Sequence, residues 1–302
     1  QELNRFNNTS LVAAINTVPG IRMEERSPGS YRLNIRGSSL RAPFGVRNVK
    51  VYYNNIPFTD PGGNTFFNQL GYYNFQSLEI IKGPGSSLYG AGTGGVILIN
   101  SLEEDFTKGA SINFSYGSYQ TVNRNFKINF GSDDFRNTVS FSQLNSEGYR
   151  NHTQLERINF NWDAGVKLSD KGKLQASLLY GDLYYQTPGA LTYAQYLQNP
   201  KAARPAAGPS PSSEAARAAI YTKTFLSGFS YEHQFTSRFS NITSLYAAFS
   251  ELKNPTIRNY EKRTEPHFGG RTMLQYEAGA SMASLKFQAG MEFQQGLATV
   301  NV

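Results

Sequence analysis

Residues 77–100 read SLEIIKGPGSSLYGAGTGGVILIN, and this stretch decides how the chain folds. Glycines lie between two apolar runs, which indicates a turn-rich link between two strands, because glycine allows φ > 0 and close backbone packing. Gly90, Gly92 and Gly95 fit the spacing G-x-G-x-x-G, but a dinucleotide site needs a helix after its glycines. Here the strand-like run at residues 96–99 follows, and no lysine follows the last glycine as in a phosphate loop. We therefore do not interpret the stretch as a nucleotide site.

The composition limits the class of protein. The chain has 302 residues, of which 39 % are hydrophobic, 14 % aromatic and 17 % charged. No apolar run approaches the roughly 18 residues of a spanning helix, so a soluble protein or a membrane protein of alternating strands remains. There is no cysteine, hence no disulfide framework, thiolate metal site or cysteine nucleophile. The net charge of +7 is spread along the chain, which does not favour nucleic-acid binding.

From about residue 109 onward, apolar and polar residues alternate with the period of a β-strand. A lipid-facing sheet and a soluble sandwich both alternate, so the two groups of residues are first only two faces. If the sheet faces lipid, we expect one group outside and the other in the lumen. The outer group is Phe114, Phe126, Ile128, Phe160, Trp162, Leu285 and Phe287. The inner group is Asn113, Lys127, Asn159, Asn161, Lys286 and Gln288.

The lengths of the connections favour a membrane barrel over a sandwich. We expect about nine strands of about 9–15 residues, near or above the roughly 9–11 that cross a bilayer. Short connections are expected at residues 132–137, 169–173, 237–240 and 279–284. They alternate with a tight turn at 117–120 and long loops at 145–153, 187–221 and about 253–270. Short turns at one end and long loops at the other are typical of outer-membrane barrels.

The glycine-rich stretch resembles the end of the plug domain of TonB-dependent outer-membrane receptors. Three upstream segments resemble plug motifs in the right order: residues 17–21 (TVPGI), 33–37 (LNIRG) and 49–57 (VKVYYNNIP). The sequence departs from the family at two places. Asn54 and Asn55 replace the common Asp-Gly, which keeps a tight turn because Asn tolerates the left-handed region. Lys82 stands where Arg is usual, which keeps the charge and loses the bidentate fork.

The resemblance implies a mixed α/β plug domain inside an antiparallel transmembrane β-barrel. We expect the plug at residues 1–105 and the N-terminal portion of the barrel at 106–302. The family's barrel has about 22 strands around a plugged lumen, and an open sheet would leave unpaired edges in lipid. We therefore expect a piece of a longer protein of the bacterial outer membrane. A short helix is expected at residues 10–16, with Thr9 or Ser10 as N-cap.

The resemblance also implies function. It indicates a gated uptake transporter and not an enzyme, with no cofactor and no metal site of its own. The expected ligand is a small anionic metal chelate of the ferric-siderophore type, because the plug loops are basic. Residues 186–192 (QTPGALT) also resemble a loop of ferric citrate receptors. The alternative is uptake of oligosaccharide or peptide with a partner lipoprotein. Expected partners are outer-membrane lipid and a TonB-type energy-transducing protein, bound through an N-terminal segment that is not visible before Gln1.

The candidate site residues follow from the same resemblance, since the upper plug loops of such receptors help to form the ligand site. Arg41 and Arg47 would attract an anion, with Asp60 and Asn64 in the second plug loop. Solvated or wall-facing charge is the competing interpretation of these loops. Further candidates lie in a barrel loop: Arg258, Tyr260 and Arg263. A second group, expected to pair with each other and with barrel glutamates and so to control gating, is Arg36, Glu79 and Lys82.

Overall fold

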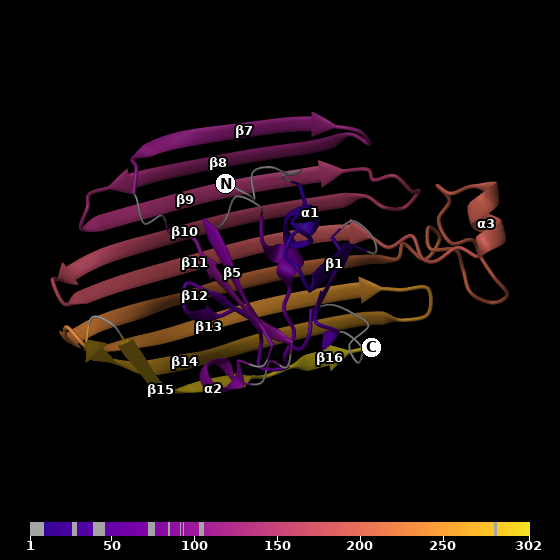
Figure 1. The fold of residues 1–302 in the computed structure, drawn as a ribbon. Coiled ribbons are helices and arrows are strands. Elements are labelled where there is room, and N and C mark those ends of the chain that lie inside the picture. The colour runs from indigo at the N-terminus through magenta and orange to yellow at the C-terminus, as the bar shows by residue number, and fades with distance from the viewer. Residues whose placement is uncertain are drawn as a thin grey trace.

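The computed structural model places a small N-terminal part against one face of a large sheet (Figure 1). It describes residues 9–25, 29–38, 46–71, 76–83, 85–90, 92, 94–102, 106–280 and 283–302. No helix in this described part is long and apolar enough to cross a membrane.

The N-terminal part contains a β-hairpin, a four-stranded sheet of order β4-β3-β6-β5 and short helices. Its elements are α1 (Val12–Ile15), β1 (Ile21–Glu25), β2 (Tyr31–Ile35), β3 (Val49–Tyr53), β4 (Ile56–Pro57), η3 (Phe67–Gln69), β5 (Ser77–Lys82), α2 (Ser86–Tyr89) and β6 (Gly95–Asn100).

The glycine-rich stretch forms β5, one helical turn and β6, and the two strands pair antiparallel while β3 pairs parallel to β6. The strand–turn–strand interpretation is therefore confirmed, with α2 as an addition. Gly95 begins β6 at φ +146°, where a Cβ would lie 2.3 Å from the carbonyl oxygen of Ile81. Only glycine fits this close approach of two backbones.

The expected first helix is present as α1, but its N-cap differs from the prediction. The cap is Leu11, whose side chain makes no capping hydrogen bond. Ser10 contributes one step further out, where its Oγ accepts from the Val12 N–H at 3.3 Å. The burial of Leu11 explains the shift, since Leu11 is 3 % exposed and belongs to the apolar core of the N-terminal part.

The second part is one antiparallel sheet in which the strands follow each other in sequence order from β7 to β15, with β16 added beside β14. The strands are β7 (Gly109–Gly117), β8 (Thr121–Gly131), β9 (Phe135–Ser146), β10 (Leu155–Ser169), β11 (Gly172–Gln186), β12 (Ala219–Thr236), β13 (Phe239–Pro255), β14 (Tyr260–Ala280), β15 (Ala283–Gly296) and β16 (Thr299–Asn301). The connection from β11 to β12 carries α3 (Tyr193–Gln198) and projects beyond one end of the sheet (Figure 1).

One loop prediction was wrong. The expected long loop at about residues 253–270 is a short turn, because β13 continues to Pro255 and β14 begins at Tyr260. Gly269 and Gly270, which resemble turn residues, lie inside β14. A Cβ on Gly269 would come within 2.9 Å of the Tyr246 ring, and one on Gly270 within 2.6 Å of Leu245. These glycines make room for large side chains on the neighbouring strand, which is a known role of glycine within sheets.

The two faces of the large sheet agree with the predicted sets. Six of the seven expected outer residues are exposed, between 37 % for Trp162 and 67 % for Phe114, and Ile128 is intermediate. On β10 the expected inner residues Asn159 and Asn161 are buried, at 0 % and 1 %. Asn113 and Lys286, on the flanks of the sheet, are exposed, while Lys127 and Gln288 are intermediate.

The outer face carries a continuous row of aromatic residues across six strands. Directly paired residues make up this row: Phe126, Phe141, Phe160, Tyr180, Phe225 and Phe249. Nearer the short-turn end, Phe235 and Phe239 stack with ring centroids 5.1 Å apart. On β13 the outer-face residues Ala247 and Leu245 lie between Phe249 and Phe239, as expected for a strand that runs between two interfacial aromatic girdles.

The N-terminal part packs on the inner face, and its apolar core continues into the sheet. Leu179, Leu226, Tyr246 and Ala248 from β11 to β13 belong to the same buried cluster as Ile56. The cluster therefore joins the two parts and is not confined to the N-terminal one.

The aromatic row and the Phe235–Phe239 pair indicate how deep in the bilayer each outer-face residue lies. Leu245 is 49 % exposed and lies between the aromatic row and the Phe235–Phe239 pair. Tyr221, 43 % exposed, lies beyond the row, toward the long-loop end of the sheet. Leu245→Arg should lower the free energy of unfolding by about 2–4 kcal/mol, because a charge is placed near the bilayer centre, and Tyr221→Arg by about 1 kcal/mol or less. Guanidinium unfolding of the full-length protein in lipid vesicles measures both. Equal losses at the two positions would contradict a lipid-facing surface.

Candidate functional site

The structure brings three of the predicted ligand residues together, Arg47 just before β3 and Asp60 and Asn64 before η3. The Nε of Arg47 donates to Oδ1 of Asn64 at 2.9 Å. The carboxylate of Asp60 accepts from the Asn64 backbone N–H at 2.8 Å. Asn64 therefore connects an exposed cation to a buried carboxylate, since Asp60 is only 7 % exposed. Arg41 lies outside the described residues.

A cavity of about 400 Å³ separates this loop from the large sheet. Asn64 and Asn68 line it from the N-terminal side, and Thr222, Asn254 and Arg263 line it from β12 to β14. It lies at the end of the sheet where the long loops are found. Arg263 therefore faces the same space as Asn64, although the two residues are far apart in sequence.

The charge of Arg263 is largely compensated. Its Nη2 lies 2.6 Å from Glu261 and its Nη1 lies 3.6 Å from Glu265. These three residues alternate along β14 and so share one face of the strand. Tyr260 has the opposite parity, the same as the exposed Phe268, and is itself 49 % exposed. The predicted trio is thus divided, with Arg263 inside, Tyr260 on the outer face and Arg258 exposed in the turn before β14.

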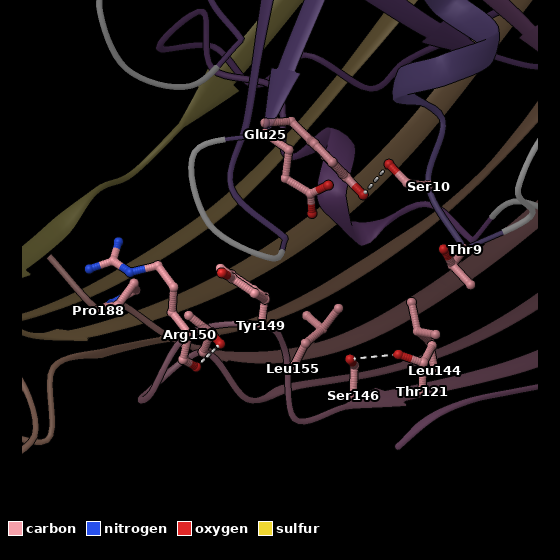
Figure 2. Close-up of a pocket in the computed structure, with 12 residues that line it drawn as sticks. Thr9, Ser10, Glu25, Thr121, Leu144, Ser146, Tyr149, Arg150, Leu155 and Pro188 are labelled. Carbon is pink, nitrogen blue, oxygen red and sulfur yellow. Dashed lines mark hydrogen bonds between the residues drawn. The ribbon is translucent and has the colours of Figure 1, made fainter. Parts of the chain in front are cut away.

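A second cavity, of about 370 Å³, opens between the β1–β2 hairpin and the ends of β9 and β10. Figure 2 shows Ser10 and Glu25 on one side, with Tyr149, Arg150 and Leu155 on the other. Desolvation raises the pKa of the Glu25 carboxyl, against the opposing effects of the Gly29 N–H and of Arg157. Tyr31 lines both cavities, so the two openings flank one buried tyrosine.

Arg150 in this second cavity has a structural role. Its guanidinium donates to the carbonyl oxygen of Ala202 at 2.9 Å and to that of Gly189 at 2.9 Å. Both acceptors belong to the long β11–β12 connection. Arg150 therefore holds that loop against the β9–β10 loop, and two carbonyl oxygens solvate part of its guanidinium charge.

The buried contacts between the N-terminal part and the sheet were missed by sequence reasoning. The Tyr53 hydroxyl donates to Oδ2 of Asp163 at 2.8 Å, and the Asn54 amide donates to Oδ1 at 2.8 Å. Asn161 donates to the Tyr53 hydroxyl oxygen at 3.1 Å. Asp163 is 1 % exposed and Tyr53 is 0 % exposed. Asn54 and Asn55 do adopt the left-handed turn conformation, at φ 49° and 65°, but the turn pattern alone carried no sign of the buried carboxylate.

The predicted gating residues lie on the N-terminal part, and within the described residues none of them forms an ion pair with the large sheet. Glu79 is exposed and Lys82 is half-buried, both on β5, while Arg36 follows β2 at φ 49°. Among the described residues no ion pair joins these three. Their gating role remains a prediction.

Comparison with known proteins identifies the family of the N-terminal part. Residues 1–97 match the family model described as TonB-dependent Receptor Plug Domain. A curated relative, the vitamin B12 transporter BtuB of Vibrio vulnificus (strain CMCP6), is 26 % identical over 129 residues, which are 42 % of this chain and 20 % of BtuB.

Solved structures extend the likeness to the whole chain. The unliganded ferric citrate transporter FecA has a TM-score of 0.77 at 14 % identity, and 97 % of this chain covers 46 % of FecA. The ferric yersiniabactin uptake receptor FyuA from Yersinia pestis has a TM-score of 0.73 at 14 % identity, with 97 % and 47 % covered. The chain thus spans less than half of these receptors.

The N-terminal part is a plug, and the large sheet is a section of barrel wall. Residues 1–97 match the plug-domain family of TonB-dependent receptors, and the whole chain shares the fold of the plug and the adjoining barrel wall of outer-membrane receptors such as FecA. The predicted fold class, a plug with about nine wall strands out of a barrel of about 22, is confirmed by this architecture.

The buried contacts of Asp163 with Tyr53 and Asn54 allow a test of how the plug is held against the barrel wall. Asp163→Ala should remove the carboxylate that accepts from Tyr53 and from Asn54, although the Asn54 amide keeps the hydroxyls of Ser101 and Ser177 as acceptors. Loss of a buried hydrogen-bond partner costs about 1–3 kcal/mol. We expect faster amide hydrogen exchange at residues 51–54 in the full-length protein. Asp182→Ala is the matched control, because Asp182 lies on the outer face of β11, 3.3 Å from Lys223. Equal protection of residues 51–54 in the wild type and in Asp163→Ala would argue against this role.

Proposed function

We propose that this protein is an active outer-membrane transporter that binds a scarce extracellular ligand, a ferric-siderophore-type iron complex, and passes it to the periplasm by rearrangement of the plug. The supporting observation is the cavity of about 400 Å³ between plug and wall, with Asn64 and Arg263 on opposite sides and Arg47 bonded to Asn64. FecA and FyuA, whose names state ferric ligands, share the fold.

The available positive charge at this cavity comes from the plug. Arg263 is compensated by two glutamates, whereas Arg47 donates to a neutral amide and keeps its charge. Arg41 precedes it in the same loop of the sequence. At a narrow, partly walled mouth an anionic ligand would meet these guanidinium groups at a reduced effective dielectric, where charge-assisted contacts are strong.

The same proposal assigns domains and partners. Residues 1–105 act as the plug and 106–302 as the first section of the barrel wall. Arg36, Glu79 and Lys82 take part in plug movement. A TonB-type protein supplies energy through an N-terminal segment, and outer-membrane lipid contacts the aromatic rows of the outer face.

One observation favours a second candidate. The cavity is lined by the amides of Asn64, Asn68 and Asn254 as well as by the compensated Arg263. Amides suit a neutral ligand rich in hydroxyl or peptide groups. Uptake of oligosaccharide or peptide with a partner lipoprotein is therefore the alternative, and it predicts binding that is insensitive to loss of the arginines.

Replacing both plug arginines tests the choice. Charge-assisted hydrogen bonds contribute about 1.5–3 kcal/mol each. Arg41→Ala with Arg47→Ala should therefore weaken an anionic ferric chelate by about two to four decades if the contributions add. The measurement is the dissociation constant of ferric citrate and of a panel of anionic ferric chelates for the full-length protein in detergent.

Two controls accompany this test. Heat-modifiable gel mobility should be unchanged, because both substituted positions precede the wall strands in the sequence. Asn64→Ala removes the partner of Arg47 but keeps the charge, so it should cost much less than the double variant. Unchanged affinity for every anionic ligand that the wild type binds would move the site to the barrel loops, where Arg258, Tyr260 and Arg263 are the next candidates.

A further inference from the structure

A second cluster of charge lies in the seam between plug and wall, away from the cavity at Asn64. Lys50 and Tyr52 project from the same face of β3 toward β14 and β15. There Arg271 and Glu292 are directly paired in the register of the two strands. Glu292 accepts from the Lys50 ammonium on Oε1 and from the Tyr52 hydroxyl on Oε2, the latter at 2.7 Å. Both carboxylate oxygens are therefore already used by plug residues.

Arg271 is the cation that this arrangement leaves poorly matched. Its Nε lies 3.9 Å from Oε2 of Glu292, which is beyond hydrogen-bond reach. Its Nη2 donates to the carbonyl oxygen of Leu88 at 2.8 Å. The guanidinium carbon also lies 4.8 Å from the ring centroids of both Tyr52 and Tyr89. The side chain is 9 % exposed, so a nearly buried guanidinium relies on a carbonyl, the Met273 sulfur at 3.8 Å and two aromatic faces.

The charges of the cluster do not cancel. Lys50 and Arg271 are cationic and Glu292 is the one carboxylate within ion-pair distance of them in the described part of the chain. Burial and the neighbouring Glu292 raise the pKa of the Tyr52 hydroxyl, so this hydroxyl stays neutral and donates. The seam therefore holds a surplus positive charge in a place where water screens it weakly.

A cavity of about 220 Å³ opens directly at this surplus charge. Arg271 and Glu292 line it from the wall, and Leu88, Tyr89 and Gly90 line it from the turn that carries α2. We propose that this cavity is a binding site for a small oxyanion, a carboxylate or phosphate group, with Arg271 as its principal ligand. The anion completes the charge balance of the seam and competes with Glu292 for the guanidinium.

This site is separate from the cavity at Asn64, and the proposal does not rest on the proposed function. The oxyanion could be free in solution or could be the carboxylate arm of a chelate. The two sources are distinguished by measuring all binding in a variant that carries Arg41→Ala and Arg47→Ala. These substitutions are expected to weaken chelate binding at the cavity near Asn64.

The test uses full-length receptor in detergent and isothermal titration calorimetry with inorganic phosphate, iron-free citrate and ferric citrate. Arg271→Gln should weaken phosphate and citrate at least 10-fold, and Glu292→Gln should strengthen them by about 10-fold, because a contact with a charged group contributes about 1.5–3 kcal/mol. Lys286→Gln is the matched control, since Lys286 also pairs with a glutamate across β14 and β15, at 3.7 Å from Glu277, but is 52 % exposed.

The opposite signs separate binding from a structural role. If the cluster only fastened the plug, both substitutions would loosen it, and neither would raise affinity for an anion. Weakening by Glu292→Gln, or no measurable binding of phosphate and citrate by the unsubstituted cluster at millimolar concentration, overturns the proposal. Preference for ferric citrate over free citrate in the same background identifies the chelate arm as the occupant, and equal binding identifies the free anion. Heat-modifiable mobility and hydrogen exchange at residues 49–53 confirm that each variant keeps its plug in place.

Discussion

Hydrogen bonding of the inner face of the barrel wall is the constraint on which the rest of this structure depends. A wall strand presents polar side chains to the lumen, and once a plug covers them each must find a partner or cost about 1–3 kcal/mol. On strand β10, polar residues at alternate positions find hydrogen-bond partners on the plug. Asn159 donates to the backbone carbonyl of Gln69, Asn161 donates to Tyr53, and Asp163 accepts from Tyr53 and Asn54. The plug surface is therefore shaped by the polar pattern of the wall.

The contacts between plug and wall are largely polar, and a polar interface opens more easily than an apolar core. The apolar contact between plug and wall includes Ile56, Leu226 and Tyr246, whereas hydrogen bonds and ion pairs run along β3 on both of its faces. Water can replace a hydrogen bond at little net cost, but it cannot replace buried apolar area. A plug held mainly in this way can separate from the wall when water enters, without first exposing a large hydrophobic surface.

Much of the architecture could be predicted from the sequence because its signals are local. Alternation in Phe160 and Trp162 gave the outer face, and the glycines after α2 gave the link between β5 and β6. Two local patterns misled. Gly269 and Gly270 suggested a loop but only make room for Tyr246 and Leu245. That error had a consequence, because reading residues 260–265 as loop hid the alternation that places Glu261 and Glu265 beside Arg263.

The candidate site was less predictable because its contacts join distant parts of the chain. Lys50 and Glu292 are separated by 242 residues, and Asn54 and Asp163 by 109. No periodicity or spacing encodes such pairs. A sequence shows which residues carry charge, but the compensation of each charge is decided by the register of strands and by the seating of the plug. This is why the exposed Arg47 could be proposed from its loop alone, while Arg271 could not.

The two arginines also differ in how their charge can act at a distance. Arg47 is exposed, so salt at physiological strength screens it beyond about 8 Å, and it can attract a ligand only near the mouth. Arg271 is nearly buried, and its field is weakened less by salt, but a ligand can reach it only through the cavity between the α2 turn and the wall. The exposed charge is therefore suited to capture. The buried charge is suited to holding an anion at the seam, where the anion would take over part of the compensation that Glu292 now provides.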